Sequence, residues 1–447
     1  MLNAQTLSLD ACRQKALEHN KSLSSAKAKL EQTKFDMKSY KANFFPQMNL
    51  MALDLYSTAK GDIGIDPFQI PIKKLDMATG TFNYDVTVLP DGSYVPNTLL
   101  DFPGMKEEWK VKNFWAAGVT LMEPLYAGGK ISTAYNMSKV GVSMATENIR
   151  LTESEVLVST DEAYFLAIKA KQLGEVAQSY KALLVELRKN VENAFKHGMA
   201  TRNDVMKVQV KLNEAELSIQ KAENGYRLAC MNLCHVIGMP LDSKIDVDDS
   251  CINSSSESVS YAASDISARP EHAILEGKTE LARQNVKLAK SDILPNVMAG
   301  ATYTYANGLE LAGKKLFDSG SASVGVMVKV PIDIFGGGTN KVRSAKAAYQ
   351  IAQLEQEDLN EKMLLELAQC TNIMNESLTE LNLCITSLDQ AEENMRLSKQ
   401  QYEVGLEPLT SYLESQALWQ QAASNLVQAR CQHQLSQMKY KKAAGKM

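Results

Sequence analysis

One segment of the 447-residue chain has the composition of a phosphate-binding loop. Residues 308–315 place a glycine at each end of a short stretch and follow it with two lysines. In such a loop, backbone N–H groups and a lysine hold the phosphate, and a Ser or Thr follows. That last residue is missing here, and no helical pattern follows the lysines. We therefore interpret the segment as a lysine-bearing turn between two strands.

A second group of candidate ligands lies on a helical pattern. Cys230, Cys234 and His235 fall on adjacent turns, and zinc prefers Cys and His ligands. A structural zinc site needs a second ligand pair, which the sequence does not offer at a suitable spacing. The five histidines are scattered, and no Ser–His–Asp or paired-carboxylate arrangement is recognisable. The sequence thus predicts no metal, no cofactor and no enzymatic activity.

The composition is that of a folded protein, with 45% hydrophobic and 22% charged residues. A net charge of −4 does not favour nucleic acid as a partner. Seven cysteines are an odd number, so we expect mostly free thiols. No apolar run is long enough for a transmembrane helix, so a membrane span would have to consist of β-strands. No signal peptide is recognisable, and residues 2–4 fit both the remnant of a cleaved export signal and an ordinary start.

The chain contains an internal repeat. Gly198 and Gly405 lie 207 residues apart in similar contexts, and Pro124 and Pro331 keep the same offset. The upstream match between residues 44–46 and 293–295 has an offset of 249, which indicates an insertion of about 42 residues in the first copy. We predict three segments, namely a first repeat 1–240, a polar linker or equatorial segment 241–267 and a second repeat 268–447.

Each copy has the same order of elements. A helix of moderate length leads to two strands, a very long helix, a glycine turn and a return helix. Apolar residues spaced by threes and fours from Met363 to Tyr402 indicate a coiled-coil seam. About 65 helical residues span roughly 100 Å. The predicted helices are 8–43, 130–195 and 201–237 in the first copy, and 268–292, 339–402 and 408–444 in the second.

Four stretches alternate between apolar and small or polar residues, as strands do. A lipid-facing barrel wall and a half-buried sheet of a soluble domain both show this alternation. Each stretch has a proline at its helix-proximal end, which marks the change from strand to helix: Pro46, Pro124, Pro295 and Pro331. Four strands cannot close a barrel, but three chains would supply twelve. The predicted strands are approximately 46–58, 112–124, 295–306 and 321–333.

This order resembles the TolC-type outer-membrane efflux family over nearly the whole chain. The matching stretches are residues 9–46, 123–129, 269–271 and 402–413. The resemblance implies an α+β membrane protein, in which a long antiparallel α-helical coiled-coil barrel continues into a transmembrane β-barrel with four strands per chain. It implies a homotrimer in the outer membrane of a Gram-negative bacterium, with a long periplasmic extension. The implied function is a passive exit duct of a tripartite efflux or type I secretion system.

The resemblance also assigns partners. It places the two glycine turns at the periplasmic tips, where a periplasmic adaptor (membrane fusion) protein would dock. An inner-membrane pump, proton-driven or of the ABC type, would stand behind the adaptor, and outer-membrane lipid would surround the strands. The residues expected at the docking tips are Gly198, Met199, Val404, Gly405 and Leu406.

The periplasmic entrance is expected just past these turns. By resemblance, Asp204 matches an acidic entrance position and Tyr402 an aromatic gating position. Glu407 stands where a gating arginine can occur, and Arg202 is a candidate replacement for that arginine. We expect Asp204 and Glu414 to form acidic rings that attract cations. The alternative is that these carboxylates lie on solvated helix ends.

The alternative is a protein of another class, namely a structural coiled-coil protein or the periplasmic adaptor of an export complex. An adaptor has one helical hairpin between small β-domains, which fits a duplicated pattern poorly. Extraction that requires detergent would favour the channel. The inserted loop, roughly residues 59–110, carries five lysines against eight acidic residues. We expect it to face outside the cell and to narrow the mouth of the duct.

Overall fold

The computed structural model describes residues 5–253, 266–316 and 318–447. It divides into a helical unit (1–40, 132–289 and 336–447) and a strand unit (41–131 and 290–335). Each unit takes segments from both copies of the repeat. The compact units therefore follow the type of secondary structure, whereas the repeat describes the order along the chain.

Among the described residues, the helical unit contains seven α-helices, and its two longest have 67 residues each. The prediction of one continuous helix over residues 8–43 is wrong, because this stretch forms two helices separated at Asn20. Asn20 has an extended backbone, and its side-chain oxygen accepts from the N–H groups of Ser22 and Leu23 at 2.8 and 3.3 Å. Such side-chain bonds compete with a continuous helix. The helices are α1 Leu9–His19, α2 Lys21–Ala42, α3 Lys130–Lys196, α4 Arg202–Val236, α5 Pro270–Ser291, α6 Gly337–Glu403 and α7 Leu409–Ala443.

The repeat is visible in how the return helices end. Asn20 Nδ2 donates to the carbonyl of Val236 at 2.9 Å, and Arg269 Nη1 donates to the carbonyl of Ala443 at 3.4 Å. These donors lie 249 residues apart and the acceptors 207, the same two offsets as in the sequence. Each donor satisfies a carbonyl that the end of a helix leaves without an intrahelical partner. The two copies thus share a structural junction as well as a sequence pattern.

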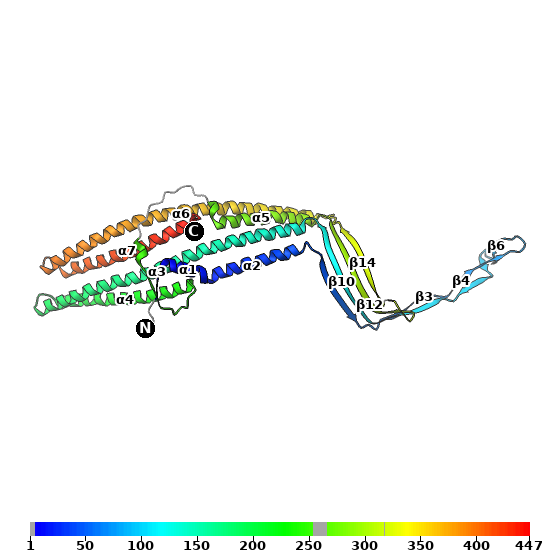
Figure 1. The fold of residues 1–447 in the computed structure, drawn as a ribbon, viewed down its shortest axis with the longest axis horizontal. Helices are drawn as coiled ribbons and strands as arrows, with labels where there is room; N and C mark the ends of the chain where they lie inside the picture. Colours follow the sequence, from blue (N-terminus) through cyan, green and yellow to red (C-terminus); the bar gives the residue numbers. More distant parts are fainter. Residues whose placement is uncertain (1–4, 254–265, 317) are drawn as a thin grey trace. The chain divides into compact units, whose positions relative to one another are not determined.

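The pair α6–α7, drawn side by side in Figure 1, contains a buried polar cluster. His433 is 1% exposed, and its Nδ1 lies 2.9 Å from Ser377 Oγ, which in turn lies 2.7 Å from Ser436 Oγ. Gln437 Nε2 lies 3.0 Å from His433 Nε2. Because the Gln437 amide nitrogen donates, Nε2 accepts and Nδ1 carries the proton. A neutral imidazole therefore satisfies the cluster.

Acidification is expected to weaken this helix pair. Burial lowers the pKa of His433 below its ordinary value of 6.5. The unfolded chain then binds the proton more readily than the folded chain does. The contribution of the neutral His433 to the free energy of unfolding is therefore complete above the ordinary pKa of 6.5, and it is lost as the pH falls below that value. Thermal unfolding followed by circular dichroism at several pH values should show this slope in the wild type. His433→Gln should flatten the slope and the exposed-site control His19→Gln should not; equal slopes in all three proteins would contradict the assignment.

The strand unit is organised around a four-stranded antiparallel sheet. Its order is β14–β12–β10–β2, so β2 and β14 are the outer strands. Pro124 was predicted to lie at the end of its strand. It lies instead inside β10, where the register shifts between Pro124 and Tyr126. A residue without an N–H is tolerated at such an irregularity. The strands are β2 Gln47–Leu55, β10 Met105–Ala127, β12 Asn296–Leu311 and β14 Asp318–Lys329, with β13 Lys314–Lys315 at the β12 turn.

The inserted segment is not a simple loop. It forms a ribbon of short antiparallel strands that runs on from β10 (Figure 1). We call residues 60–110 the arm. Because its first strand pairs with residues 105–110, β10 begins earlier than predicted. The remaining strands of the arm are β3 Lys60–Ile65, β4 Phe68–Pro71, β5 Lys73–Leu75, β6 Phe82–Tyr84, β7 Val86–Val88, β8 Tyr94–Pro96 and β9 Leu99–Phe102.

None of the helices in the described part of the chain combines the length and the apolar character needed to cross a membrane. All seven cysteines are free thiols, as the sequence predicted. Five of them lie in or against one core cluster of the helical unit, where burial raises the pKa of each thiol: Cys12, Cys230, Cys234, Cys251 and Cys431.

Candidate functional site

The two glycine turns have the same backbone geometry. Gly198 and Gly405 have φ angles of +76° and +77°, which favour glycine. The N–H of Met199 donates to the carbonyl of Ala194, and that of Leu406 to the carbonyl of Gln401, each at 2.9 Å. This pattern ends a helix with a left-handed residue. The side chains at the tips stay in solvent, with Met199 77%, Val404 70% and Leu406 81% exposed.

Behind the tips, the helical hairpins α3–α4 and α6–α7 share one apolar core. Tyr180 and Leu184 of α3 pack with Val208 of α4 and with Leu409 and Tyr412 of α7. An ion pair between Lys399 Nζ and Glu186 Oε1, at 3.2 Å, also joins α6 to α3. The turns of the two copies are therefore held together although they lie more than 200 positions apart in sequence.

Tyr402 lies at the contact between the hairpins. Its ring stacks on Tyr412 with centroids 5.4 Å apart and planes 20° apart. Burial raises the pKa of Tyr402, and the negative charge of Asp204 raises it further. Tyr402 and Asp204 line a cavity of about 600 Å³, together with Glu186, Lys399 and Tyr412. The structure thus brings together Tyr402 and Asp204, two of the residues expected at the entrance.

Asp204 also has a structural role in its own helix. Its carboxylate accepts from the N–H and the hydroxyl of Thr201 at 3.1 and 2.7 Å, while its N–H donates to Thr201 Oγ1 at 3.2 Å. This is a capping box at the start of α4. These bonds to Thr201 lower the pKa of Asp204, and Lys207 Nζ lies 3.5 Å away. Asp204 is therefore charged, but its charge is partly balanced by its own helix.

Two further positions differ from the expected arrangement. Ser398 Oγ donates to Glu407 Oε2 at 2.7 Å, so Glu407 stabilises the turn between α6 and α7. Glu414 is exposed on α7 and lines a different cavity from Asp204, of about 570 Å³, together with Lys207 and Lys211. Arg202 is exposed in the first turn of α4. The two predicted acidic positions therefore lie in separate cavities of the chain.

Some residues of the site were not identified from the sequence. Lys399, Glu186 and Tyr412 all line the cavity, and their contacts join helices that are distant in the chain. No local pattern reveals such pairs. The capping box, in contrast, could have been recognised from the spacing of Thr201 and Asp204.

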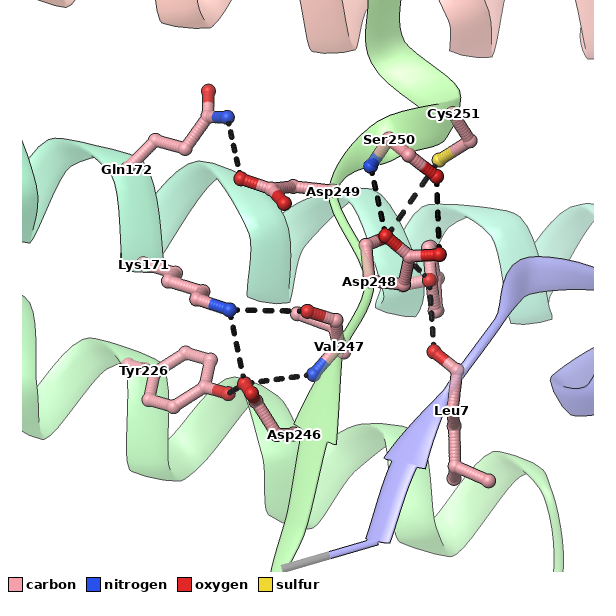
Figure 2. A network of polar contacts seen from close by, with 11 residues as sticks. Leu7, Lys171, Gln172, Tyr226, Asp246, Val247, Asp248, Asp249, Ser250 and Cys251 are labelled. Atoms are coloured by element: carbon pink, nitrogen blue, oxygen red, sulfur yellow. Dashed lines mark hydrogen bonds and ion pairs between the residues drawn. The ribbon is translucent and has the colours of Figure 1, made fainter.

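A polar network lies elsewhere in the helical unit, where the first strand meets the segment predicted as a linker (Figure 2). Within that segment, residues 245–247 form β11 (Ile245–Val247), which pairs in parallel with β1 (Gln5–Leu7). Asp246 Oδ1 accepts from Tyr226 at 2.7 Å and from Lys171 at 3.1 Å. The hydroxyl of Tyr164, which is fully buried, lies 2.9 Å from the carbonyl of Leu7 and 2.6 Å from that of Asp248.

This network is structural in character. The carboxylates of Asp248 and Asp249 accept from Ser250 and Gln172, respectively (Figure 2). Its acidic groups therefore already have protein donors. Within residues 5–253, 266–316 and 318–447, no group of three or more His, Cys, Asp or Glu side chains is placed to hold a metal ion.

Comparisons with known proteins identify relatives of the chain. A family model described as "Outer membrane efflux protein" matches residues 269–446, which is nearly the whole second copy. The outer membrane protein TolC of Vibrio cholerae is 21% identical over 338 residues, which cover 74% of this chain and 76% of that protein. The alkaline protease secretion protein AprF of Pseudomonas aeruginosa is 25% identical over 272 residues, covering 59% of this chain and 55% of AprF.

Solved structures show the same fold. The outer membrane protein VceC of Vibrio cholerae aligns with a TM-score of 0.73 at 16% identity, covering 98% of this chain and 96% of VceC. The outer membrane channel CmeC of Campylobacter jejuni aligns with a TM-score of 0.72 at 16% identity, covering 98% of this chain and 85% of CmeC. The predicted combination of long helices with four antiparallel sheet strands per chain is thereby confirmed.

Proposed function

Because this chain belongs to the outer membrane efflux protein family, we infer that it is the exit channel of an efflux or type I secretion system. It is a non-enzymatic transporter in the outer membrane of a Gram-negative bacterium, with a periplasmic extension. The duplicated order of two strands, a long helix and a return helix carries this conclusion.

Channels of this family form homotrimers in tripartite systems. We propose that three copies of this chain close a twelve-stranded barrel. The outer strands β2 and β14 support this, because an open sheet edge exposes unpaired backbone groups that lipid cannot satisfy. The helical units would then form the tunnel, with Pro46, Pro124, Pro295 and Pro331 at its junction with the barrel.

The specific partners are proposals as well. We propose that a periplasmic adaptor docks on Gly198, Met199, Val404, Gly405 and Leu406, because apolar side chains exposed at a helix turn favour a protein partner. An inner-membrane pump, proton-driven or of the ABC type, would load the duct through that adaptor. The cargo would be a small molecule or a protein; the name of AprF indicates a protein cargo for that relative.

We propose that the periplasmic entrance is formed by Asp204, Arg202, Tyr402 and Glu414 in three copies. The cavity that Asp204 shares with Tyr402 supports this assignment. Carboxylates concentrated at a constriction raise the local negative potential and attract cations. Glu414 is exposed and shares its cavity with Lys207 and Lys211, whereas the carboxylate of Asp204 is bound to Thr201 and lies 3.5 Å from Lys207 Nζ. Glu414 is therefore expected to contribute more to the potential.

Single-channel recordings in planar bilayers test this function and its entrance. Asp204→Asn combined with Glu414→Gln should weaken cation selectivity and block by divalent ions, and Glu414→Gln should account for most of the change. Glu31→Gln, an exposed carboxylate on α2, is the matched control and should behave as wild type. Unchanged selectivity in the double variant would exclude these residues as the entrance ring. A purified protein without any channel activity would contradict the proposed function itself.

A further inference from the structure

The outer part of the arm lacks the support of the main sheet. Among the described residues, the ladder between β10 and β12 ends at the Trp109–Leu311 pair, next to a bond from the N–H of Ala312 to the carbonyl of Glu108, and residues 105–107 pair only with β3. A two-stranded ribbon is at best marginally stable in water by itself. At the bend that follows, Gly104 has a φ of +61°, and a Cβ there would meet the backbone of Pro67 at 2.7 Å. The ribbon thus has a defined bend that leads to β4 and β9.

Beyond that bend, one face of the ribbon is apolar. Residues directly opposite each other in an antiparallel pair lie on the same face, and side chains alternate between faces along each strand. Phe68 lies opposite Phe102, with ring centroids 4.9 Å apart, and Ile70 lies opposite Leu100. We call these four residues the arm face. They are 38–54% exposed in the single chain.

The other side of the same strands is polar at its centre. Gln69 Nε2 donates to Asp101 Oδ1 at 2.7 Å on the face opposite the arm face. Further along the arm, Asp85 accepts from Asn97 at 3.0 Å, and Asp91 accepts from Ser93 at 2.7 Å. The negative charge of the arm is thus partly held by its own turns. An apolar face that is backed by a polar face can bury its side chains against a partner while the other face stays in water.

We propose that the arm face binds the arm faces of the other two copies in the trimer, so that three arms form a cap over the outer mouth. This inference rests on the proposed trimeric channel. β3 pairs with β10 on the same side as β2, so the edge that a neighbouring copy must cover continues directly into the arm. Cyclic symmetry then brings three identical faces to one axis.

An outer-membrane lipid surface is the other occupant with matching chemistry. The arm carries five lysines and eight acidic residues, a net charge of −3. Membrane attraction through charge requires clusters of Lys and Arg near an anionic surface, which the arm does not have. Burial against other arms removes the same apolar groups from water without that requirement. The charge of the arm therefore argues against lipid, and the continuous open edge of β2 and β3 favours a second copy of the chain.

Cross-linking of the full-length trimer in detergent tests the contact. Leu100→Cys puts a thiol on the arm face, and its neighbour Asp101→Cys puts one on the opposite face. With a short bismaleimide reagent, Leu100→Cys should give several-fold more covalent dimer than Asp101→Cys or wild type. The native cysteines are buried or half-buried, and wild type measures their background. Equal yields from the two variants, in a protein that light scattering shows to be trimeric, would overturn the arm contact and leave the channel intact.

Two further measurements separate the remaining outcomes. A fluorophore on Leu100→Cys in lipid nanodiscs should not be quenched by spin-labelled lipid; strong quenching would mean that the arm lies on the membrane and would overturn the proposal. Leu100→Ser combined with Phe102→Ser should raise single-channel conductance relative to Asp101→Ser, because the cap would open. A protein that is only monomeric in detergent would overturn both the proposed trimer and the contact built on it.

Discussion

Replacing Arg13 by methionine is expected to lower the free energy of unfolding by about 3–5 kcal/mol, because it leaves a buried carboxylate without its cation. Arg13 Nε and Nη2 donate to the two oxygens of Asp161, both at 2.8 Å. The side chain of Asp161 is fully buried, and that of Arg13 is 26% exposed. This bidentate pair joins α1 to the middle of α3, next to the core cluster that contains Tyr164 and Phe165.

The pH dependence of this variant has a defined sign. Burial raises the pKa of Asp161 even with Arg13 present, and removal of Arg13 should raise it further. When the pKa of a carboxyl group is higher in the folded state than in the unfolded chain, the free energy of unfolding falls as the pH rises. It recovers as the pH falls. The loss in the free energy of unfolding caused by Arg13→Met should thus be largest at neutral pH and smaller in acid. Chemical unfolding followed by far-UV circular dichroism at several pH values measures both effects.

An exposed ion pair supplies the matched control. Arg283 donates to both oxygens of Glu280 at 2.6 and 2.8 Å, but its side chain is 52% exposed. Exposed pairs contribute roughly 0–1 kcal/mol, so Arg283→Met should have little effect. Adding Asp161→Leu to Arg13→Met should restore much of the stability, because the unpaired charge is removed. Equal destabilisation by Arg13→Met and Arg283→Met would contradict the importance of burial.

The long helices could be predicted closely from the sequence because two independent signals agree there. Apolar residues at spacings of three and four define α6, and Gly405 ends it with the positive φ that glycine permits. The break at Asn20 was missed because an asparagine in a polar helical pattern carries no strong signal. The strands of the arm were missed because they have only three to six residues between turn-rich stretches. Short strands are recognised from their pairing partners, which a sequence pattern does not provide.

The candidate site was predictable only in part. Asp204 and Tyr402 were found through resemblance, and the structure places both at one cavity. The ion pair of Lys399 with Glu186 and the packing of Tyr412 against Tyr180 and Leu184 depend on how the two hairpins pack. Such contacts join side chains whose separation in sequence is unrelated to their distance. The exposed Glu414 was predicted to act with Asp204, but helix geometry places it on another cavity.

Replacing Tyr402 by alanine is expected to raise single-channel conductance several-fold by loosening the entrance. The stacked pair of Tyr402 and Tyr412 joins the end of α6 to the shared core of the two hairpins. An aromatic pair contributes about 0.5–1.5 kcal/mol beyond the area it buries. Since 1.4 kcal/mol corresponds to a factor of ten, its loss can shift the balance between closed and open entrances by up to about tenfold.

Two variants separate the ring contact from other effects. Tyr402→Phe keeps the ring and loses only the hydroxyl, so its conductance should stay close to that of the wild type. Tyr440→Ala removes a half-buried tyrosine at the other end of α7, where it packs against Leu367, and should leave the entrance unchanged. If Tyr440→Ala opened the channel as much as Tyr402→Ala, general loosening of α7 would explain the result. If Tyr402→Phe did so, the hydroxyl near Asp204, rather than the stacked ring, would hold the entrance closed.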